Sequence, residues 1–287
     1  ENVPDYSIIG GAKNSSATEL DYPDDTSSNG QKNYTYTGSG GVPMGSMLTR
    51  LLFAVKYKEQ RIVLSNLINK DSKILFNRDP SLRVQKVAPW LTLDGNPYPA
   101  IVNGKILWII DGYTTSAGYP YSKFTNLATA TSNSVTAATT SVAPLADKNV
   151  NYIRNSVKAT VDAFDGSVTL YQWDSQDPVL QTWTKAFPGT VKPKSAISPA
   201  LLQHIRYPSD IFDVQRDVLG TYHVTSAGAF YGGQDFWRIP NDPSSLGANA
   251  GAQPPLYQTM KLPGSKSTDF TLSTAFVPRG GRQNLTA

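Results

Sequence analysis

Two turn signals constrain this chain more than any other feature, because they fix which strands are neighbours. Asn103-Gly104 interrupts the apolar segment 100–111, and Asn-Gly fits a type I′ turn because both central residues need positive φ. Asp165-Gly166 interrupts the segment 152–174 in the same way. Strands joined by such turns pair antiparallel, and no chain of β-α-β units is visible. The sequence therefore predicts an α+β fold of antiparallel hairpins with helices packed between them, long loops and room for two subdomains.

Helices are predicted where a capping residue precedes apolar residues at helical spacing. The first begins near Ser46, and its apolar face consists of Met47, Leu48, Leu51, Leu52 and Val55. Arg50 and Lys56 fall away from that face. Later helix starts are expected at Asp79-Pro80, Asp177-Pro178, Ser198-Pro199, Ser209 and Ser226. A last pair of strands, 257–262 and 270–276, is expected around Pro263-Gly264.

Shifts in composition along the chain predict four segments. Residues 1–45 form an irregular N-terminal arm, because this stretch is rich in turn-forming residues. Residues 46–122 form a first α+β subdomain, and residues 151–287 form a second. Between them, 123–150 is a low-complexity insertion on the surface. Its central part, 124–146, contains no charged residue and is mostly Thr, Ala and Ser, which leaves little with which to build a packed face.

Charge and cysteine content exclude several classes of protein. The 287 residues include no cysteine, so the chain has neither a disulfide framework nor a thiolate metal site. The net charge is +4, but no run of Lys or Arg resembles a nucleic-acid-binding arm, so no nucleic-acid partner is expected.

No apolar window approaches the roughly 20 residues that span a bilayer. Because the chain starts at Glu1 without Met or a signal peptide, we expect a fragment or a processed product.

Ordered motifs along most of the chain resemble a known family. They include Tyr-Thr-Gly-Ser-Gly-Gly-Val-Pro-Met-Gly-Ser from Tyr36, Ile-Leu-Phe-Asn-Arg-Asp from Ile74, Ala-Pro-Trp-Leu-Thr-Leu-Asp from Ala88, Asp-Gly-Tyr-Thr-Thr-Ser from Asp111 and Asn-Tyr-Ile-Arg-Asn-Ser-Val-Lys from Asn151. Together they resemble the uncharacterised protein family 0182, which consists of large multi-pass membrane proteins of actinobacteria and cyanobacteria.

That resemblance implies a topology and no reaction. In the family, several N-terminal membrane helices precede a C-terminal extracytoplasmic region, and this chain resembles that region. The resemblance therefore implies a location at the cell membrane, with this region on the extracytoplasmic side and its own membrane helices as one partner. It supplies no catalytic residue and no cofactor that could be carried over.

The segment that begins at Asp111 is the most suggestive for function, because a polar, aromatic loop follows a strongly apolar strand. Asp111 is a candidate acid or base. Tyr113, Tyr119 and Tyr121 are candidates for stacking on a sugar or a peptide, and an ordered loop that packs its tyrosines on the body is the structural alternative. Asp79 is a possible second carboxylate for hydrolysis, although a helix cap or a surface ion pair explains it as well.

Other segments invite a binding or catalytic hypothesis, and each has a plainer explanation. An acidic loop offers three candidate calcium ligands, namely Asp21, Asp24 and Asp25. Their spacing does not match an EF-hand, and a solvated loop explains them. The Gly-rich stretch 38–45 lacks the ending of a phosphate-binding loop, so a tight turn is favoured. His204 and His223 are the only histidines, and without a Gly-x-Ser-x-Gly motif we predict structural roles for both.

Three functional hypotheses follow. The first is that the chain is the extracytoplasmic domain of a membrane-anchored envelope protein. It would be a binding or scaffold module that contacts an envelope protein, a glycan or further copies of itself and has no cofactor. The alternative is a carboxylate-dependent hydrolase or transferase acting on cell-envelope polysaccharide or peptide, which needs two carboxylates in one cleft. The third hypothesis is an inhibitory or chaperone-like role, because the hairpin and helix of 152–187 are weakly similar to small modules of that kind in secreted proteins.

Overall fold

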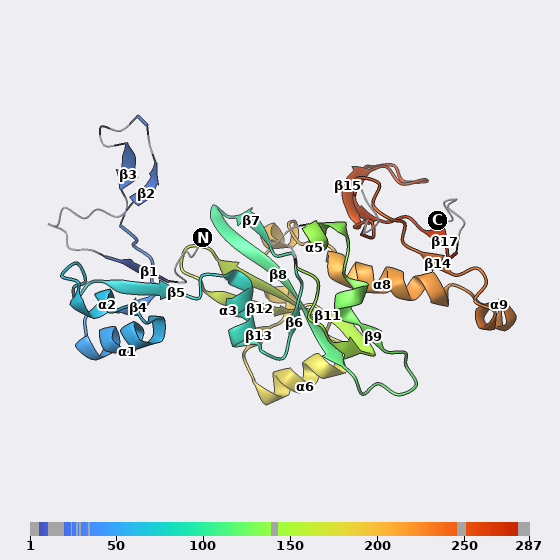
Figure 1. The fold of residues 1–287 in the computed structure, drawn as a ribbon, viewed down its shortest axis with the longest axis horizontal. Helices are drawn as coiled ribbons and strands as arrows, with labels where there is room; N and C mark the ends of the chain where they lie inside the picture. The colour runs from blue at the N-terminus through green and yellow to red at the C-terminus, as the bar shows by residue number, and fades with distance from the viewer. Residues whose placement is uncertain are drawn as a thin grey trace. The chain divides into compact units, whose positions relative to one another are not determined.

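The structure, a computed structural model, describes residues 6–10, 20–23, 25–26, 28, 30–33, 35–138, 143–245 and 251–280. It confirms the predicted α+β class, since short helices alternate with several small sheets (Figure 1). The chain forms two compact units. Unit 1 contains Glu1–Val87, Gly104–Leu107 and Val161–Val168, and unit 2 contains Ala88–Asn103, Trp108–Thr160 and Thr169–Ala287.

Unit 1 is built on a three-stranded antiparallel sheet in the order β1-β5-β4. Its strands are β1 (Tyr6–Ile9), β5 (Lys73–Phe76) and β4 (Val42–Pro43), and a separate ribbon pairs β2 (Leu20–Pro23) with β3 (Gln31–Asn33). The expectation of an irregular arm over 1–45 missed these strands. They are two to four residues long, and β1 and β4 take their partner from β5, so no local pattern marks them.

Helix α1 (Met47–Tyr57) follows Ser46 as predicted, but its apolar stripe is exposed. A stripe of this kind normally faces a core. Here Phe53, Ala54 and Tyr57, from the other side of the helix, pack into the core of unit 1. Arg50 also lies on the packed side, where its guanidinium donates to the backbone carbonyl oxygens of residues 44 and 68, both at 2.8 Å. Helices α2 (Arg61–Leu64) and α3 (Pro80–Val87) belong to the same unit.

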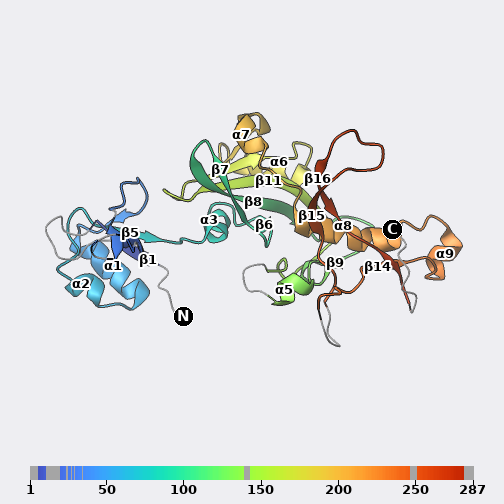
Figure 2. The same cartoon turned by 90° about the horizontal axis from the view of Figure 1, so that it is seen from above.

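A six-stranded sheet forms the centre of unit 2, in the order β13-β12-β11-β8-β6 with β7 also paired to β8. Its strands are β6 (Thr92–Leu93), β7 (Tyr98–Val102), β8 (Lys105–Ser116), β11 (Tyr152–Asp162), β12 (Val168–Gln172) and β13 (Val191–Lys192). Asn103 and Gly104 both have positive φ, 51° and 77°, as a type I′ turn requires. Both views show β8 and β11 side by side (Figures 1 and 2).

One connection in this sheet departs from the hairpin pattern. The strands β12 and β13 pair in parallel, and α6 (Pro178–Ala186) lies between them in sequence. Asp177 caps α6 as predicted, and Leu180 of this helix is fully buried. Trp183 of α6 stacks on Trp90 with ring centroids 5.4 Å apart. This crossover holds α6 against the sheet.

The predicted surface insertion is partly packed. Within 123–150 the structure has β9 (Thr125–Asn126), α4 (Leu127–Ala130), α5 (Ser134–Ala138) and β10 (Asn149–Val150), and residues 139–142 lie outside the described part. Leu127 and Leu145 are buried in one cluster with Tyr113 and Ile211. The few large apolar residues of this segment therefore suffice to pack it into unit 2, although most of the segment consists of Thr, Ala and Ser.

In the rest of unit 2 the helices begin beside the predicted serines, but Ser198 caps its helix by a side-chain hydrogen bond whereas Ser209 and Ser226 make no such bond. Its elements are the 3-10 turn η1 (Lys194–Ala196), α7 (Pro199–Leu202), α8 (Ser209–Tyr222), α9 (Ala227–Tyr231), β14 (Trp237–Arg238), β15 (Leu256–Met260), β16 (Asp269–Ser273) and β17 (Val277–Pro278). The strands β15 and β16 pair antiparallel, which confirms the last predicted hairpin. In the part of the chain that the structure describes, no helix has the length and apolarity of a membrane span.

Candidate functional site

The central strand β8 carries two of the predicted site residues into the interior, where neither can meet a ligand directly. Asp111 is buried and pairs with the buried ammonium of Lys158. Burial raises the pKa of Asp111 to about 6, although Lys158 opposes the shift. Tyr113 is fully buried, and its hydroxyl donates to Asp94 Oδ2 at 2.5 Å. Tyr113 is therefore a core residue and not a stacking surface.

Around these two residues lies a buried acid cluster, which we define as Asp94, Asp111, Asp210 and Asp213. The nearby buried cations are Lys158 and Arg216, so carboxyl groups outnumber cations. Burial and the neighbouring Asp94 raise the pKa of Asp210 to about 8, and burial raises the pKa of Asp213 to about 7 against the attraction of Arg216. Protonation therefore relieves part of the repulsion that four buried carboxylates would create.

The other two predicted tyrosines do line a cavity. Tyr119 and Tyr121 border a hollow of about 540 Å³ between the loop after β8, the start of β11 and helix α8. We call this hollow the tyrosine groove, and its other aromatic side chains are Tyr152 and Tyr222. Tyr119 stacks on Tyr152 with ring centroids 5.8 Å apart, and Tyr121 is fully exposed. Sequence analysis missed Tyr152 and Tyr222 as site residues because only the fold brings them to the predicted loop.

Asn151 fixes the backbone of the tyrosine loop. Its side-chain Oδ1 accepts from Tyr119 N at 3.1 Å, and its Nδ2 donates to Tyr119 O at 2.7 Å. The backbone N–H of Asn151 donates to Ser116 O at 3.0 Å, which ties the start of β11 to the end of β8. Tyr121 has φ of +55°, a conformation that bulky residues rarely adopt. The loop is therefore held in a defined shape with one tyrosine projecting into solvent.

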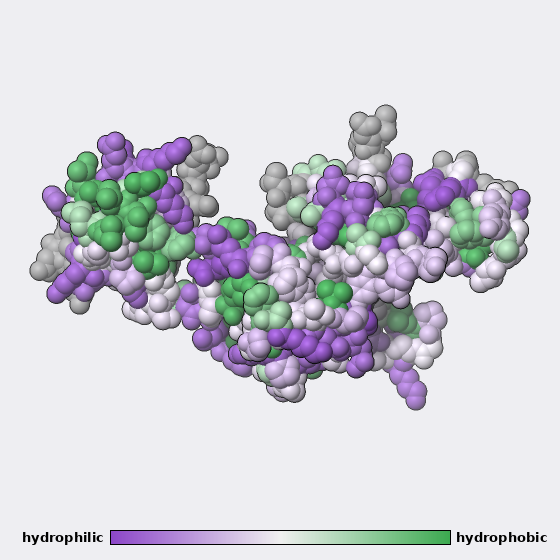
Figure 3. All heavy atoms as spheres, turned by 90° about the horizontal axis from the view of Figure 1, so that it is seen from below, coloured by the Kyte–Doolittle hydropathy of each residue, from purple (hydrophilic) through white to green (hydrophobic). Residues whose placement is uncertain are grey.

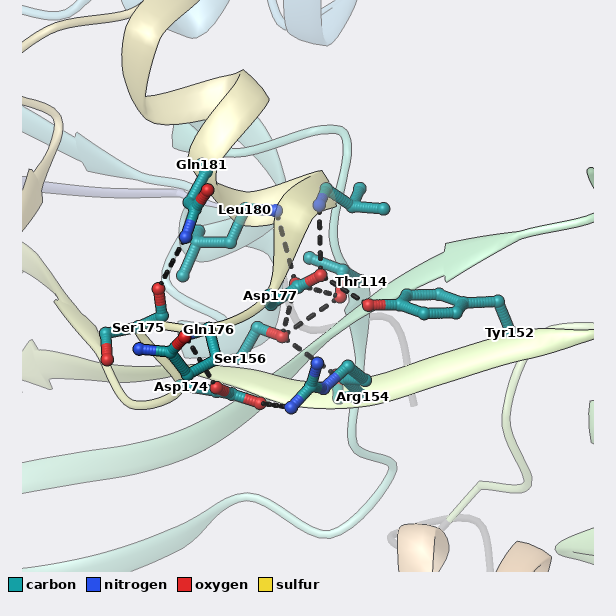
Figure 4. A network of polar contacts seen from close by, with 11 residues as sticks. Thr114, Tyr152, Arg154, Ser156, Asp174, Ser175, Gln176, Asp177, Leu180 and Gln181 are labelled. Atoms are coloured by element: carbon teal, nitrogen blue, oxygen red, sulfur yellow. Dashed lines mark hydrogen bonds and ion pairs between the residues drawn. The ribbon is translucent and has the colours of Figure 1, made fainter. Parts of the chain in front are cut away.

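Asp177 holds Tyr152 in place by accepting a hydrogen bond from its hydroxyl (Figure 4). The carboxylate of Asp177 is completely buried and accepts from the hydroxyls of Tyr152, Ser156 and Thr114, each at 2.6 Å. It also accepts from the N–H groups of Val179 and Leu180, which caps α6. Burial alone would raise the pKa of Asp177, but the hydrogen bonds from the three hydroxyls lower it below its usual range.

A second hollow, of about 460 Å³, shares Ile153 with the tyrosine groove. We call it the tryptophan pocket, because Trp173 lines it and the ammonium of Lys194 lies 3.8 Å from the Trp173 ring centroid. Asn155 also lines it, and Asn155 Oδ1 is buried without a hydrogen-bond partner among the described residues. A buried carbonyl oxygen in this situation needs a donor from water or from a ligand.

The remaining predicted site residues do not join these cavities. Asp79 accepts from Leu82 N at 2.7 Å and so caps α3, which belongs to unit 1. The side chain of Asp25 is exposed, Asp21 lies in β2, and Asp24 lies outside the described residues. Where the chain is described, no three His, Asp or Glu side chains converge as a metal site requires. The two histidines are not placed in either cavity, and both ring nitrogens of His223 contact backbone carbonyl oxygens.

Replacing Asp177 with Ala should lower the free energy of unfolding by roughly 3 to 5 kcal/mol, because it removes a helix cap and takes the carboxylate acceptor from the buried hydroxyls of Thr114 and Ser156. Urea unfolding at neutral pH measures this loss. Asp174→Ala is the matched control: its ion pair with Arg154 is partly exposed, so the loss should stay within about 1 kcal/mol. Equal losses in the two variants would contradict the assigned role of Asp177.

Replacing Asp210 with Asn should flatten the pH dependence of stability. The folded pKa of Asp210 is about 8, and the unfolded value is about 4. Burying Asp210 therefore costs no stability through its ionisation below pH ~4, and the loss of stability grows as the pH rises from ~4 towards ~8. Between pH ~5 and ~8 the free energy of unfolding should fall less in Asp210→Asn than in the wild type, by on the order of a few kcal/mol. The exposed Asp217→Asn variant on the same helix should keep the wild-type slope.

Comparison with known proteins identifies the family to which this chain is similar. The family model described as Uncharacterised protein family (UPF0182) matches residues 1–287. A UPF0182 protein of Thermobifida fusca is 55% identical over 257 residues, which is 90% of this chain and 25% of that protein. Relatives in Leifsonia xyli subsp. xyli and Streptomyces coelicolor are 51% and 50% identical over 97% and 100% of this chain.

The chain spans 28% of the length of these last two relatives. No solved structure matches it. The match along its whole length and the identities of about one half to the curated relatives agree with each other. The chain therefore belongs to the UPF0182 family.

Proposed function

We propose that this chain is the extracytoplasmic binding module of a membrane-anchored envelope protein and that it binds a glycan along the tyrosine groove and the tryptophan pocket. The observation that supports binding most directly is the groove itself, in which four tyrosines line one hollow. Two of them stack on each other, and Asp177 holds one of these by its hydroxyl. Binding sites typically combine such rigid aromatic surfaces with a few fixed polar groups.

The chemistry of the two hollows suits a sugar chain. The flat, apolar faces of sugar rings can stack on exposed tyrosine and tryptophan rings. Sugar hydroxyls donate and accept hydrogen bonds, and the polar side chains that line the tryptophan pocket include Gln215, Arg154 and Asn155. The two hollows are neighbours, since Ile153 lines both, and we propose that one extended sugar chain contacts the two. An extended glycan therefore fits better than a single small molecule.

The location part of the proposal has separate support. It rests on the topology that the family motifs imply, in which membrane helices precede an extracytoplasmic region. The chain covers about a quarter of the length of its curated relatives, so those relatives have ample further sequence to supply an anchor. The activity and partners of the whole protein are part of this proposal.

A carboxylate-dependent hydrolase has weaker support. Asp111 is buried in an ion pair, Asp79 caps a helix, and neither lines the groove or the pocket. Asp174 does line the tryptophan pocket, but its carboxylate is paired with Arg154 at 2.5 Å. Glycoside hydrolysis needs two carboxyl groups that flank the bond to be cleaved. Binding without cleavage is therefore the better interpretation.

Soluble oligosaccharides released from bacterial cell walls should quench or shift the fluorescence of this chain on binding. Tyr152→Ala and Trp173→Ala should each weaken binding by up to roughly tenfold, because the first breaks the stacked tyrosine pair of the groove and the second removes the ring that lines the pocket. Tyr231→Ala is the control, since Tyr231 is an exposed aromatic residue outside both hollows. If no cell-wall fragment binds, or if all three variants bind alike, glycan binding in the groove is wrong.

Because the chain has no cysteine, one introduced thiol can report its location. Tyr231→Cys places that thiol at a position that is 92% exposed. In intact cells producing the full-length protein, a membrane-impermeant maleimide should label Tyr231→Cys and leave the parent protein unlabelled at this chain. Labelling that appears only after the cells are permeabilised would contradict the extracytoplasmic location.

A further inference from the structure

The packing of unit 1 among its described residues does not explain the exposed stripe of α1. Its five members are Met47, Leu48, Leu51, Leu52 and Val55, and each is at least half exposed. The core of unit 1 is filled from the other side of the helix, by Phe53, Ala54 and Tyr57. An 11-residue helix that exposes five large apolar side chains pays a solvation cost that its own fold does not relieve.

The apolar surface continues beyond α1. Leu64 and Leu67 are 73% and 52% exposed. A hollow of about 520 Å³ is lined by Leu51 and Val55 from α1 and by Val63 and Leu64 from α2, so the two helices contribute to one surface. Figure 3 shows hydrophobic residues gathered over this part of unit 1. We call it the α1–α2 face. Contiguous apolar surfaces of this kind mark sites of contact with a protein or a membrane.

The charges around the α1–α2 face indicate which of these partners it meets. Between Ser46 and Asp71 the basic residues are Arg50, Lys56, Lys58, Arg61 and Lys70, and the acidic residues are Glu59 and Asp71. Arg50 is committed to backbone carbonyls, and Arg61 lies 3.8 Å from Glu59. Lys58 lines the same hollow as Leu51 and Val55, and Lys70 is exposed. The Lys56 ammonium lies instead over the aromatic rings on the packed side of the helix. The rim is therefore positively charged.

An amphipathic helix with an apolar face and a basic rim has the chemistry of an interfacial helix. Such helices lie in the plane of a bilayer, with the apolar side chains at the boundary between headgroups and acyl chains. Nearby lysines strengthen this binding when the lipid headgroups are anionic. Helix α1 is only about 16 Å long at 1.5 Å per residue, so it can lie on a bilayer but cannot cross one.

We propose that the α1–α2 face docks on the surface of an anionic lipid bilayer. In this arrangement Met47, Leu48, Leu51, Leu52 and Val55 enter the interface, and Lys58 and Lys70 meet the headgroups. The inference rests on the proposed membrane location of the chain, but it does not depend on glycan binding, because the groove and the pocket lie in unit 2.

Sedimentation with lipid vesicles tests this proposal on the chain itself. The wild type should bind vesicles made of equal parts phosphatidylcholine and phosphatidylglycerol, bind phosphatidylcholine vesicles much more weakly, and lose binding as salt is added. The double variant Leu51→Glu/Val55→Glu should bind the anionic vesicles at least about tenfold more weakly, because it removes two apolar side chains from the interface and adds two negative charges.

A matched control separates the face from a general effect of added charge. Ile106→Glu/Ile101→Glu changes two residues that are 53% and 70% exposed, close to the 51% and 71% of Leu51 and Val55. This control should bind anionic vesicles like the wild type. Circular dichroism melting should show that both double variants fold, since all four side chains are exposed.

Several outcomes would overturn the proposal. The first is a wild type that ignores anionic vesicles, and the second is a Leu51→Glu/Val55→Glu variant that binds them like the wild type. The third is self-association without vesicle binding, seen by sedimentation velocity and abolished by the same variant, which would assign the face to a second copy of this chain. None of these results depends on the cysteine-labelling test of location, so failure of the lipid contact and failure of the extracytoplasmic location are distinguishable.

Discussion

The buried carboxylate of Asp177 is the interaction on which unit 2 depends. It accepts hydrogen bonds from side chains of β8 and β11 and from the first turn of α6, so three elements meet at one group. A buried carboxylate is tolerated only when its lone pairs are satisfied, and here five donors satisfy it. The same bonds that keep the charge buried also set the position of Tyr152. Stability and the shape of the tyrosine groove therefore have one physical origin.

The acid cluster buries its carboxyl groups in a different way. Asp177 keeps its charge because donors surround it, whereas Asp210 and Asp213 have too few cations nearby and hold their protons to higher pH. Ionisation of Asp177 stabilises the folded state, whereas ionisation of Asp210 and Asp213 destabilises it. Two clusters in one unit thus respond to pH in opposite directions, the first near the usual range of aspartate and the second around neutrality.

The sequence was most informative where local chemistry decides the structure. The Asn103-Gly104 turn, the Asp177 cap of α6 and the Ser198 cap of α7 all form as predicted, because a turn or a cap depends on a few adjacent residues. The tyrosine groove could be predicted only in part. Tyr119 and Tyr121 follow an apolar strand, but their partners come from β11 and α8, and only tertiary packing brings these together. Burial of Tyr113 and Asp111 was equally invisible, since β8 is covered on both faces.

The two sides of α1 serve separate physical requirements. Its packed side contributes to the core of unit 1, whereas its outer stripe contributes nothing to that core. Folding stability and solubility are therefore governed by different residues of the same helix. Changes on the outer stripe can alter how the chain behaves at high concentration while leaving its unfolding transition unchanged. Substitutions on the outer stripe can therefore change what this helix contacts without changing the residues that pack in the core.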